Sequence, residues 1–119
     1  MPQTPRIQNV LYVTGNMRRA RSFYEDLIGP RLKFADGDRW TQYELAGQNF
    51  ALSSFGEAAP LAGGGAVVFE VDTLDCQESR LTELGGRVLH LRDMGEHGSV
   101  LVAADLDGNI FQLWTRRAG

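Results

Sequence analysis

The chain has 119 residues, of which 43% are hydrophobic and 23% charged, a length and composition typical of one globular domain. Its formal net charge of -3 gives no electrostatic attraction for nucleic acid or for an anionic membrane. The single cysteine, Cys76, excludes an internal disulfide framework, and the lack of a long apolar run or a signal-peptide apolar region predicts a cytoplasmic protein that spans no membrane.

The first half of the chain predicts one strand, one helix and three further strands. Residues 7–13 are rich in β-branched and aromatic side chains, which favours a strand. Asn16 is a good N-cap, apolar residues from Met17 to Ile28 recur at helical spacing, and Gly29-Pro30 ends the helix. The following strands are expected near residues 32–34, 39–45 and 48–54, with turns at Asp36-Gly37 and Ala46-Gly47.

The second half repeats this order after a segment of small residues, Pro and Gly at 55–65, which is typical of a linker. Residues 66–71 predict a strand. Thr73 is expected to cap a helix with an apolar edge that ends at Gly85-Gly86. Three more strands are expected from the segments RVLHL, SVLVAAD and NIFQLW.

The two halves superpose without a gap at an offset of 57 residues. Helix caps fall on helix caps and helix stops on helix stops, as when Gly29 falls on Gly86. Two unrelated α+β hairpins are the alternative, but a register kept for about 25 residues favours an internal duplication. We therefore expect a single α+β domain over residues 1–119. Its two tandem βαβββ modules, at about 7–54 and 66–115, are expected to form a curved mixed sheet around a cleft.

Two motifs resemble the glyoxalase/bleomycin-resistance/dioxygenase (vicinal oxygen chelate) superfamily. The segment NVLYVTGNMRRARSFYEDLIG resembles its opening strand and helix, where a Phe-Tyr pair, here Phe23-Tyr24, precedes a Leu-Gly stop. The segment DLDGNIFQLW (105–114) resembles its closing motif, with Leu106 in place of a proline. The resemblance implies the two-module fold and a homodimer. It leaves function open, because lyases, dioxygenases, epimerases, thiol transferases and drug-binding proteins share the fold.

The resemblance also locates the positions where metal-using members carry metal ligands. Such members place His, Glu or Gln at four strand positions, and here these positions hold Asn9, Ala51, Ala66 and Gln112. Alanine cannot ligate a metal, and neutral amides are poor substitutes for imidazole or carboxylate. A slip of one residue would exchange Asn9 for Gln8 and still leave two amides. We therefore predict that the protein holds no metal and no other cofactor.

Strand alternation divides the predicted strands into two faces. One set of side chains is assigned to the core beneath the helices: Phe50, Leu52, Val67, Phe69, Phe111 and Leu113. The opposite set is apolar with a few amide and hydroxyl groups, as in a small-molecule pocket: Asn9, Leu11, Ala51, Ser53, Ala66, Val68, Gln112 and Trp114. Trp114 suits stacking on a planar ligand or a subunit contact. Trp40 and Tyr43 either extend the wall of this pocket or are structural.

These observations favour a metal-independent small-molecule binding protein of the bleomycin-resistance type, with an antibiotic as one candidate ligand. The alternatives are a glyoxalase-type lyase or ring-cleaving dioxygenase with diverged metal ligands, and an interaction module with a vestigial cleft. The sequence identifies no catalytic residue. We expect a small-molecule ligand, no nucleic-acid or membrane partner, and a homodimer whose mode of association the sequence leaves open.

Overall fold

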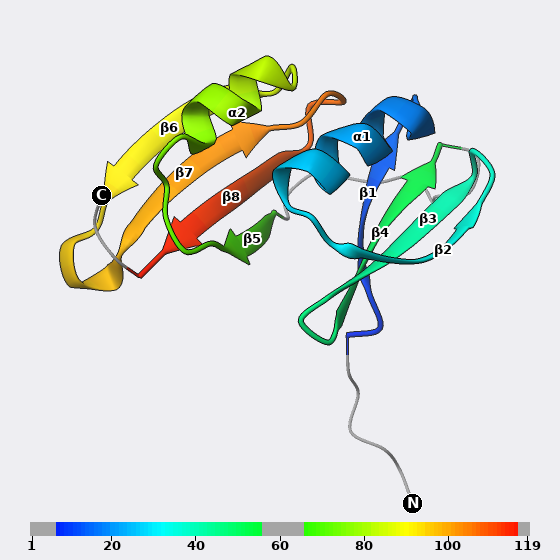
Figure 1. Ribbon diagram of the computed structural model, residues 1–119, viewed down its shortest axis with the longest axis horizontal. Helices are drawn as coiled ribbons and strands as arrows, with labels where there is room; N and C mark the ends of the chain where they lie inside the picture. Colours follow the sequence, from blue (N-terminus) through cyan, green and yellow to red (C-terminus); the bar gives the residue numbers. More distant parts are fainter. Residues whose placement is uncertain (1–6, 56–65, 117–119) are drawn as a thin grey trace, which may run out of the picture.

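A computed structural model describes residues 7–55 and 66–116, so most of the predicted linker at 55–65 lies outside the described residues. The elements follow the predicted order in each half (Figure 1). The first half contains β1 (Val10–Thr14), α1 (Met17–Leu27), β2 (Arg31–Asp36), β3 (Trp40–Leu45) and β4 (Gln48–Ser54). The second half contains β5 (Val67–Glu70), α2 (Gln77–Glu83), β6 (Arg87–Asp93), a short 3-10 helix (Gly95–His97), β7 (Ser99–Ala104) and β8 (Ile110–Thr115).

Each half forms a four-stranded mixed sheet with the same strand order. The orders are β1-β4-β3-β2 and β5-β8-β7-β6, with β1 parallel to β4, β5 parallel to β8 and the other pairs antiparallel. Even the irregularities repeat, because the second strand of each module shifts register at one residue, between Leu32 and Phe34 and between Val88 and His90. The predicted fold of two βαβββ modules is confirmed. No helix within the described residues is long and apolar enough to cross a membrane.

Helix α1 forms as its sequence pattern predicts. The Asn16 side chain accepts a hydrogen bond from the backbone N–H of Arg19 at 3.2 Å, which satisfies one of the free donors at the helix start. The chain leaves the helix at Gly29, whose φ of +72° suits glycine. The residues that form the buried stripe are Met17, Ala20, Phe23, Tyr24 and Leu27.

Helix α2 starts one turn later than the sequence predicts, so the expectation of a helix capped by Thr73 is wrong. The Thr73 hydroxyl accepts from the backbone N–H of Asp75 at 3.1 Å and so stabilises a local turn instead. Cys76 then adopts a left-handed conformation with a φ of +64°, and α2 begins at Gln77 without a side-chain cap. The helix has 7 residues, against 11 in α1.

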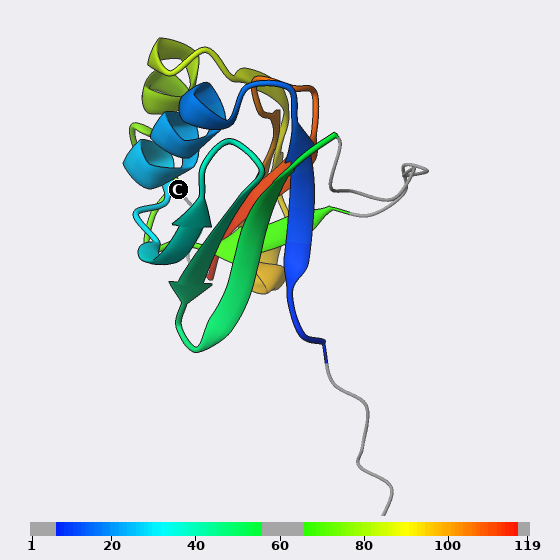
Figure 2. The same ribbon diagram turned by 90° about the vertical axis from the view of Figure 1, so that its right-hand side faces the viewer.

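The two modules share one aromatic core. The ring of Phe111 on β8 lies 6.1 Å from that of Phe23 and 6.0 Å from that of Tyr24, both on α1. Phe69 on β5 links the sheets, because its ring is 5.6 Å from Phe50 and 6.1 Å from Phe111. Helix α1 therefore packs against both sheets (Figures 1 and 2). Of the residues assigned to the core, Val67 is partly buried against this cluster, and the buried ones are Phe50, Leu52, Phe69, Phe111 and Leu113.

The closing motif stabilises the junction between the modules. The buried carboxylate of Asp105 accepts from the Tyr24 hydroxyl at 2.7 Å and from the Asn109 side-chain amide at 2.9 Å. The Asn109 amide also donates to the backbone carbonyl of Val13 on β1 at 2.9 Å. Asp105 and Asn109 therefore anchor the turn before β8 to α1 and β1 of the first module. We call this arrangement the Asp105 junction.

All three tyrosines of the chain are held in their neutral form by their surroundings. Burial raises the pKa of Tyr24, and the nearby Asp105 carboxylate raises it further. Burial also raises the pKa of Tyr43, with its hydrogen bond to Glu25 as the next cause, and it raises the pKa of Tyr12 against the opposing effect of the Val67 hydrogen bond. Tyrosine ionisation is therefore coupled to unfolding.

We expect the free energy of unfolding to fall as the pH rises above about 10, the unfolded pKa of tyrosine, by up to about 1.4 kcal/mol per pH unit for each tyrosine. Below that pH the native and unfolded states hold the same tyrosine protons, so this contribution is fully present. Urea unfolding at a series of pH values, with tyrosinate absorbance recorded, measures the effect. Tyr24→Phe should make the fall shallower. Native tyrosines that ionise near pH 10 without unfolding would contradict the prediction.

Candidate functional site

Each sheet has one face covered by the core and one face that points away from it. We call these outward faces the first open face (β1-β4-β3-β2) and the second open face (β5-β8-β7-β6). On the first open face the strand registers align residues in two rows. The rows contain Leu11, Ala51, Gln42 and Phe34, and Val13, Ser53, Trp40 and Asp36.

The second open face has two equivalent rows. One row runs from β5 to β6 through Glu70, Trp114, Val100 and Arg92. The next row runs through Val68, Gln112, Val102 and His90. Gln112 and Trp114 are two residues apart on β8, so their side chains lie about 7 Å apart on the same face.

The predicted site residues divide between these two faces. Leu11, Ser53 and Trp40 lie on the first open face, and the half-buried Asn9 immediately precedes β1. Ser53 is fully buried there, and its hydroxyl donates to its neighbour's carbonyl. On the second open face, Val68 is 54% exposed, and Gln112 and Trp114 are half-buried. Six of the eight predicted site residues therefore lie at strand positions on the sides that the helices leave open.

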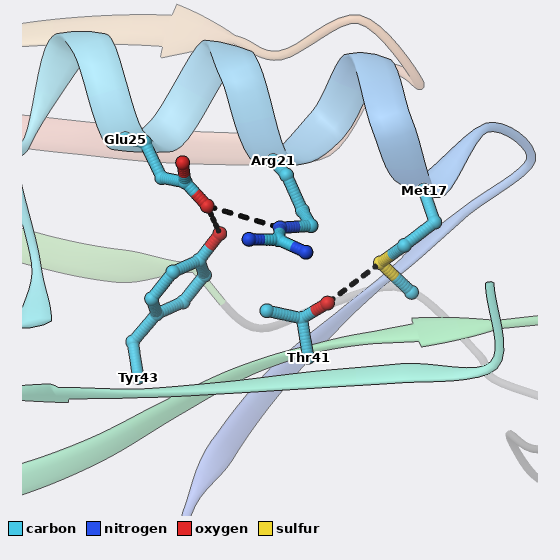
Figure 3. A network of polar contacts seen from close by, with 5 residues as sticks. All are labelled: Met17, Arg21, Glu25, Thr41 and Tyr43. Atoms are coloured by element: carbon cyan, nitrogen blue, oxygen red, sulfur yellow. Dashed lines mark hydrogen bonds and ion pairs between the residues drawn. The ribbon is translucent and has the colours of Figure 1, made fainter. Parts of the chain in front are cut away.

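Tyr43 takes the structural alternative that the sequence left open. It is fully buried beneath α1, where its hydroxyl donates to Glu25 at 2.8 Å (Figure 3). The Arg21 guanidinium donates to the same carboxylate oxygen at 3.0 Å. On the same strand, the Thr41 hydroxyl contacts the Met17 sulfur at 3.3 Å (Figure 3). These contacts place Tyr43 and Thr41 under the helix and Trp40 on the other side of the sheet.

One chain does not bring the two groups of predicted residues together. Helix α1 packs against both sheets, so both open faces are turned away from this shared core (Figures 1 and 2). Two hollows among the described residues lie elsewhere, one beside α2 and β6 and one between α1 and Leu106. A site that uses both Trp40 and Trp114 therefore needs both open faces, and each face supplies one half of it.

Trp114 is held in a fixed orientation on the second open face. Its indole N–H donates to the backbone carbonyl of His97 at 2.8 Å. The Arg116 guanidinium lies 5.8 Å from the ring centroid, a cation–π distance, and its Nε is 3.2 Å from the Glu70 carboxylate. Gly98, with a φ of +86°, permits this approach, because a Cβ there would lie 2.9 Å from the indole nitrogen and 2.1 Å from the Thr115 carbonyl oxygen. These contacts orient the indole ring before any ligand binds.

Polar residues of β2, β3 and β4 were missed among the candidate site residues. The Trp40 indole N–H donates to the Gln42 side chain at 3.2 Å. Glu44 is paired with Arg31, which lowers the pKa of the Glu44 carboxyl, and the Lys33 ammonium donates to Asn49 at 3.1 Å. Alternation counted from Trp40 would have placed Gln42 and Glu44 on the first open face.

The four family metal positions do not supply a metal site. Ala51 is fully buried and pairs with Leu11 and Gln42, so a methyl group occupies that position. Ala66 places a methyl group at a second of the four positions, and Asn9 and Gln112 supply only neutral amides at the other two. Over residues 7–55 and 66–116, no group of three or more His, Cys, Asp or Glu side chains converges on one point. This donor set does not fit the carboxylate and imidazole ligands that divalent metals require.

Comparison with known proteins identifies the architecture. The chain matches no protein-family model, and no curated protein is significantly similar in sequence.

Solved structures do match over nearly the whole chain. A glyoxalase-related enzyme from Fulvimarina pelagi is 18% identical with a TM-score of 0.80, covering 94% of this chain and 88% of its own. Lactoylglutathione lyase from Agrobacterium tumefaciens is 17% identical with a TM-score of 0.75, covering 96% of each chain. The E126Q mutant of the fosfomycin resistance protein FosX from Listeria monocytogenes, complexed with Mn(II) and 1S,2S-dihydroxypropylphosphonic acid, is 14% identical with a TM-score of 0.76, covering 94% and 90%. The protein therefore has the fold of the vicinal oxygen chelate superfamily, to which its opening and closing motifs point.

Proposed function

We propose that this protein binds a planar small molecule without a metal ion, in the manner of the bleomycin-resistance type. The observation that carries the proposal is the pair formed by Trp114 and Gln112 on the second open face. The oriented indole offers a large apolar surface for stacking, and the amide beside it offers one donor and one acceptor in a fixed direction. The donor set at the family metal positions supports binding over catalysis, because neutral amides cannot activate water as a metal does.

The binding site is completed by a second copy of the chain. Each chain presents two outward half-sites, and a two-fold dimer can set the first open face of one copy against the second open face of the other. Exposed apolar side chains on these faces support such an interface, with Phe34 51% and Val68 54% exposed. Among the described strands, β1 and β5 lie at the edges of their sheets, and their outer sides are further surfaces that an interface would cover.

Light scattering is expected to show a homodimer at micromolar concentration. Val68→Lys should weaken the dimer, because it places a charge at the centre of an apolar contact surface. Leu89→Lys is the matched control, since Leu89 is 46% exposed at the β6 register shift, outside the rows that carry the predicted site. A monomer at micromolar concentration would remove the shared-site arrangement.

Trp114→Ala should weaken ligand binding at least tenfold, about 1.4 kcal/mol, without unfolding the protein. Gln112→Ala should weaken binding less, because one neutral hydrogen bond contributes about 0.5–1.5 kcal/mol. Planar compounds, including glycopeptide and quinone antibiotics, are screened by tryptophan fluorescence in the Trp40→Phe background, where Trp114 is the remaining reporter, and the affinities of all variants are compared by isothermal titration calorimetry.

Three controls separate binding from the alternatives. Trp114→Phe should restore part of the affinity, because it keeps an aromatic ring. Treatment with a chelator should leave the affinity unchanged, and mass spectrometry should recover the compound intact. Turnover of a bound compound, or loss of binding with the chelator, would favour the lyase or dioxygenase with diverged ligands. A Trp114→Ala variant that binds like the parent protein would exclude the stacking role.

A further inference from the structure

The second module has a hollow on its helix side, beside α2. It has a volume of about 420 Å³ and lies between the start of α2 with the residues before it, the end of β6 and the start of β7. Its apolar lining is provided by Leu74, Leu91 and Leu101. The volume falls in the range of small-molecule pockets, about 300–1,000 Å³.

The internal duplication explains why this hollow exists. In the first module, α1 begins at Met17, whose sulfur covers Thr41 on β3 (Figure 3). Leu74 is equivalent to Met17 at the 57-residue offset, and Leu101 is equivalent to Thr41 by its strand register; both line the hollow. Because α2 begins only at Gln77, it is about 10 Å long against about 16 Å for α1. The hollow occupies the place of the missing helical turn.

Ser99, whose hydroxyl has no hydrogen-bond partner among the described residues, lines this space. Ser99 is 6% exposed and belongs to the hollow's lining. Its backbone pairs with β6 and β8, but within the described part of the chain its hydroxyl makes no hydrogen bond. The Ser99 oxygen is not among the buried unpaired atoms of the described residues, so it is accessible. Ser99 therefore offers a donor and an acceptor to a molecule in the hollow.

The rim of the hollow is acidic. Asp75, Glu78 and Asp93 line it, and Arg92 is the single cationic lining residue. Across the ranges that the structure describes, none of these three carboxylates takes part in an ion pair. The Asp93 carboxylate accepts from the backbone N–H of Gly95 at 2.8 Å. An apolar floor beneath an excess of carboxylates complements a cation that carries a compact apolar body.

We propose that this hollow is a second binding site, for a small organic ammonium compound with a compact apolar group. The apolar group rests on the leucine floor, where its burial removes apolar surface from water. The ammonium N–H groups donate to the carboxylates of Asp75 and Glu78 and to the Ser99 hydroxyl oxygen. The site is independent of the dimer cleft and of the metal positions.

The first test uses the full chain and two isosteric probes, 1-adamantylammonium and 1-adamantanol. Nuclear magnetic resonance is expected to show saturable shifts of the Leu91 and Leu101 methyl groups and of the Ser99 amide with the ammonium compound. The alcohol should bind at least tenfold more weakly, and added salt should weaken the ammonium compound alone. Equal binding of both probes, or shifts that map to Trp40 and Trp114, would overturn the proposal.

Substitutions supply the second test. The double variant Asp75→Asn/Glu78→Gln should weaken binding of 1-adamantylammonium at least tenfold. Glu83→Gln, on the same helix but outside the hollow, is the matched control and should bind normally. Leu91→Trp should abolish binding by filling the hollow from an exposed position. Unchanged binding by the double variant, or binding of a lysine-rich peptide in place of the small ammonium compound, would refute the proposal.

Discussion

Phe111→Ala is expected to lower the free energy of unfolding by about 3–5 kcal/mol. Phe111 is fully buried, and its ring lies within about 6 Å of the rings of Phe23, Tyr24 and Phe69. Truncation removes a large apolar side chain from water-free surroundings and leaves a cavity between the modules, where α1 and two sheets meet. Urea unfolding at one protein concentration measures the difference.

Phe55→Ala is the matched control for this prediction. Phe55 is 70% exposed, so its truncation should change the free energy of unfolding by no more than about 0.5 kcal/mol. A buried Phe→Ala change normally costs about 3–5 kcal/mol. A loss below about 1.5 kcal/mol for Phe111→Ala would therefore mean that the packing of Phe111 between the modules contributes little to stability.

Asp105→Ala should have the second largest effect, a loss of about 3 kcal/mol, because hydrogen bonds to a charged group contribute about 1.5–3 kcal/mol and unpaired buried donors cost more. The carboxylate accepts four hydrogen bonds, from the Tyr24 hydroxyl, from the backbone N–H groups of Asp107 and Asn109, and from the Asn109 side chain. Its removal leaves the buried Tyr24 hydroxyl without its acceptor. Urea unfolding and a double-mutant cycle with Tyr24→Phe measure the loss and the coupling.

The cycle should give a coupling of at least about 0.5 kcal/mol between Tyr24 and Asp105, as for residues in direct contact. Asp72→Ala is the control, because Asp72 is exposed and its side chain makes none of the hydrogen bonds found in the described part of the chain. Additive effects of Tyr24→Phe and Asp105→Ala would show that the Asp105 junction is not energetically coupled to α1.

Most of the elements could be predicted from the sequence because their signals are local, and the fold followed from the internal repeat. Helical spacing from Met17, the cap at Asn16 and the stop at Gly29 all depend on neighbouring residues, and α1 follows them. The 57-residue repeat then supplied the second module. The local signals failed at Thr73, whose side chain stabilises a turn as readily as a helix start.

The sequence predicted which side of each sheet carries the candidate site residues, but it did not predict whether the two groups of residues meet in one chain. Period-two alternation assigned Trp114 and Gln112 to one side of β8, which required only the strand itself. Alternation does not say which sheet faces which, so the separation of Trp40 from Trp114 in one chain needed the tertiary contacts of Phe111 with α1. The environment of Tyr43 also depended on tertiary contacts, because its hydroxyl bonds Glu25, which in turn pairs with Arg21 on α1.

The core shared by the modules has a consequence for folding. Although the sequence repeats itself, Phe50 and Tyr24 in one repeat are buried partly by Phe69 and Phe111 in the other. Neither repeat can open alone without exposing aromatic surface of both. We therefore expect a single cooperative unit with one two-state transition, whose denaturant m-value reflects the surface of both repeats together. The duplication produced one folding unit with two similar halves.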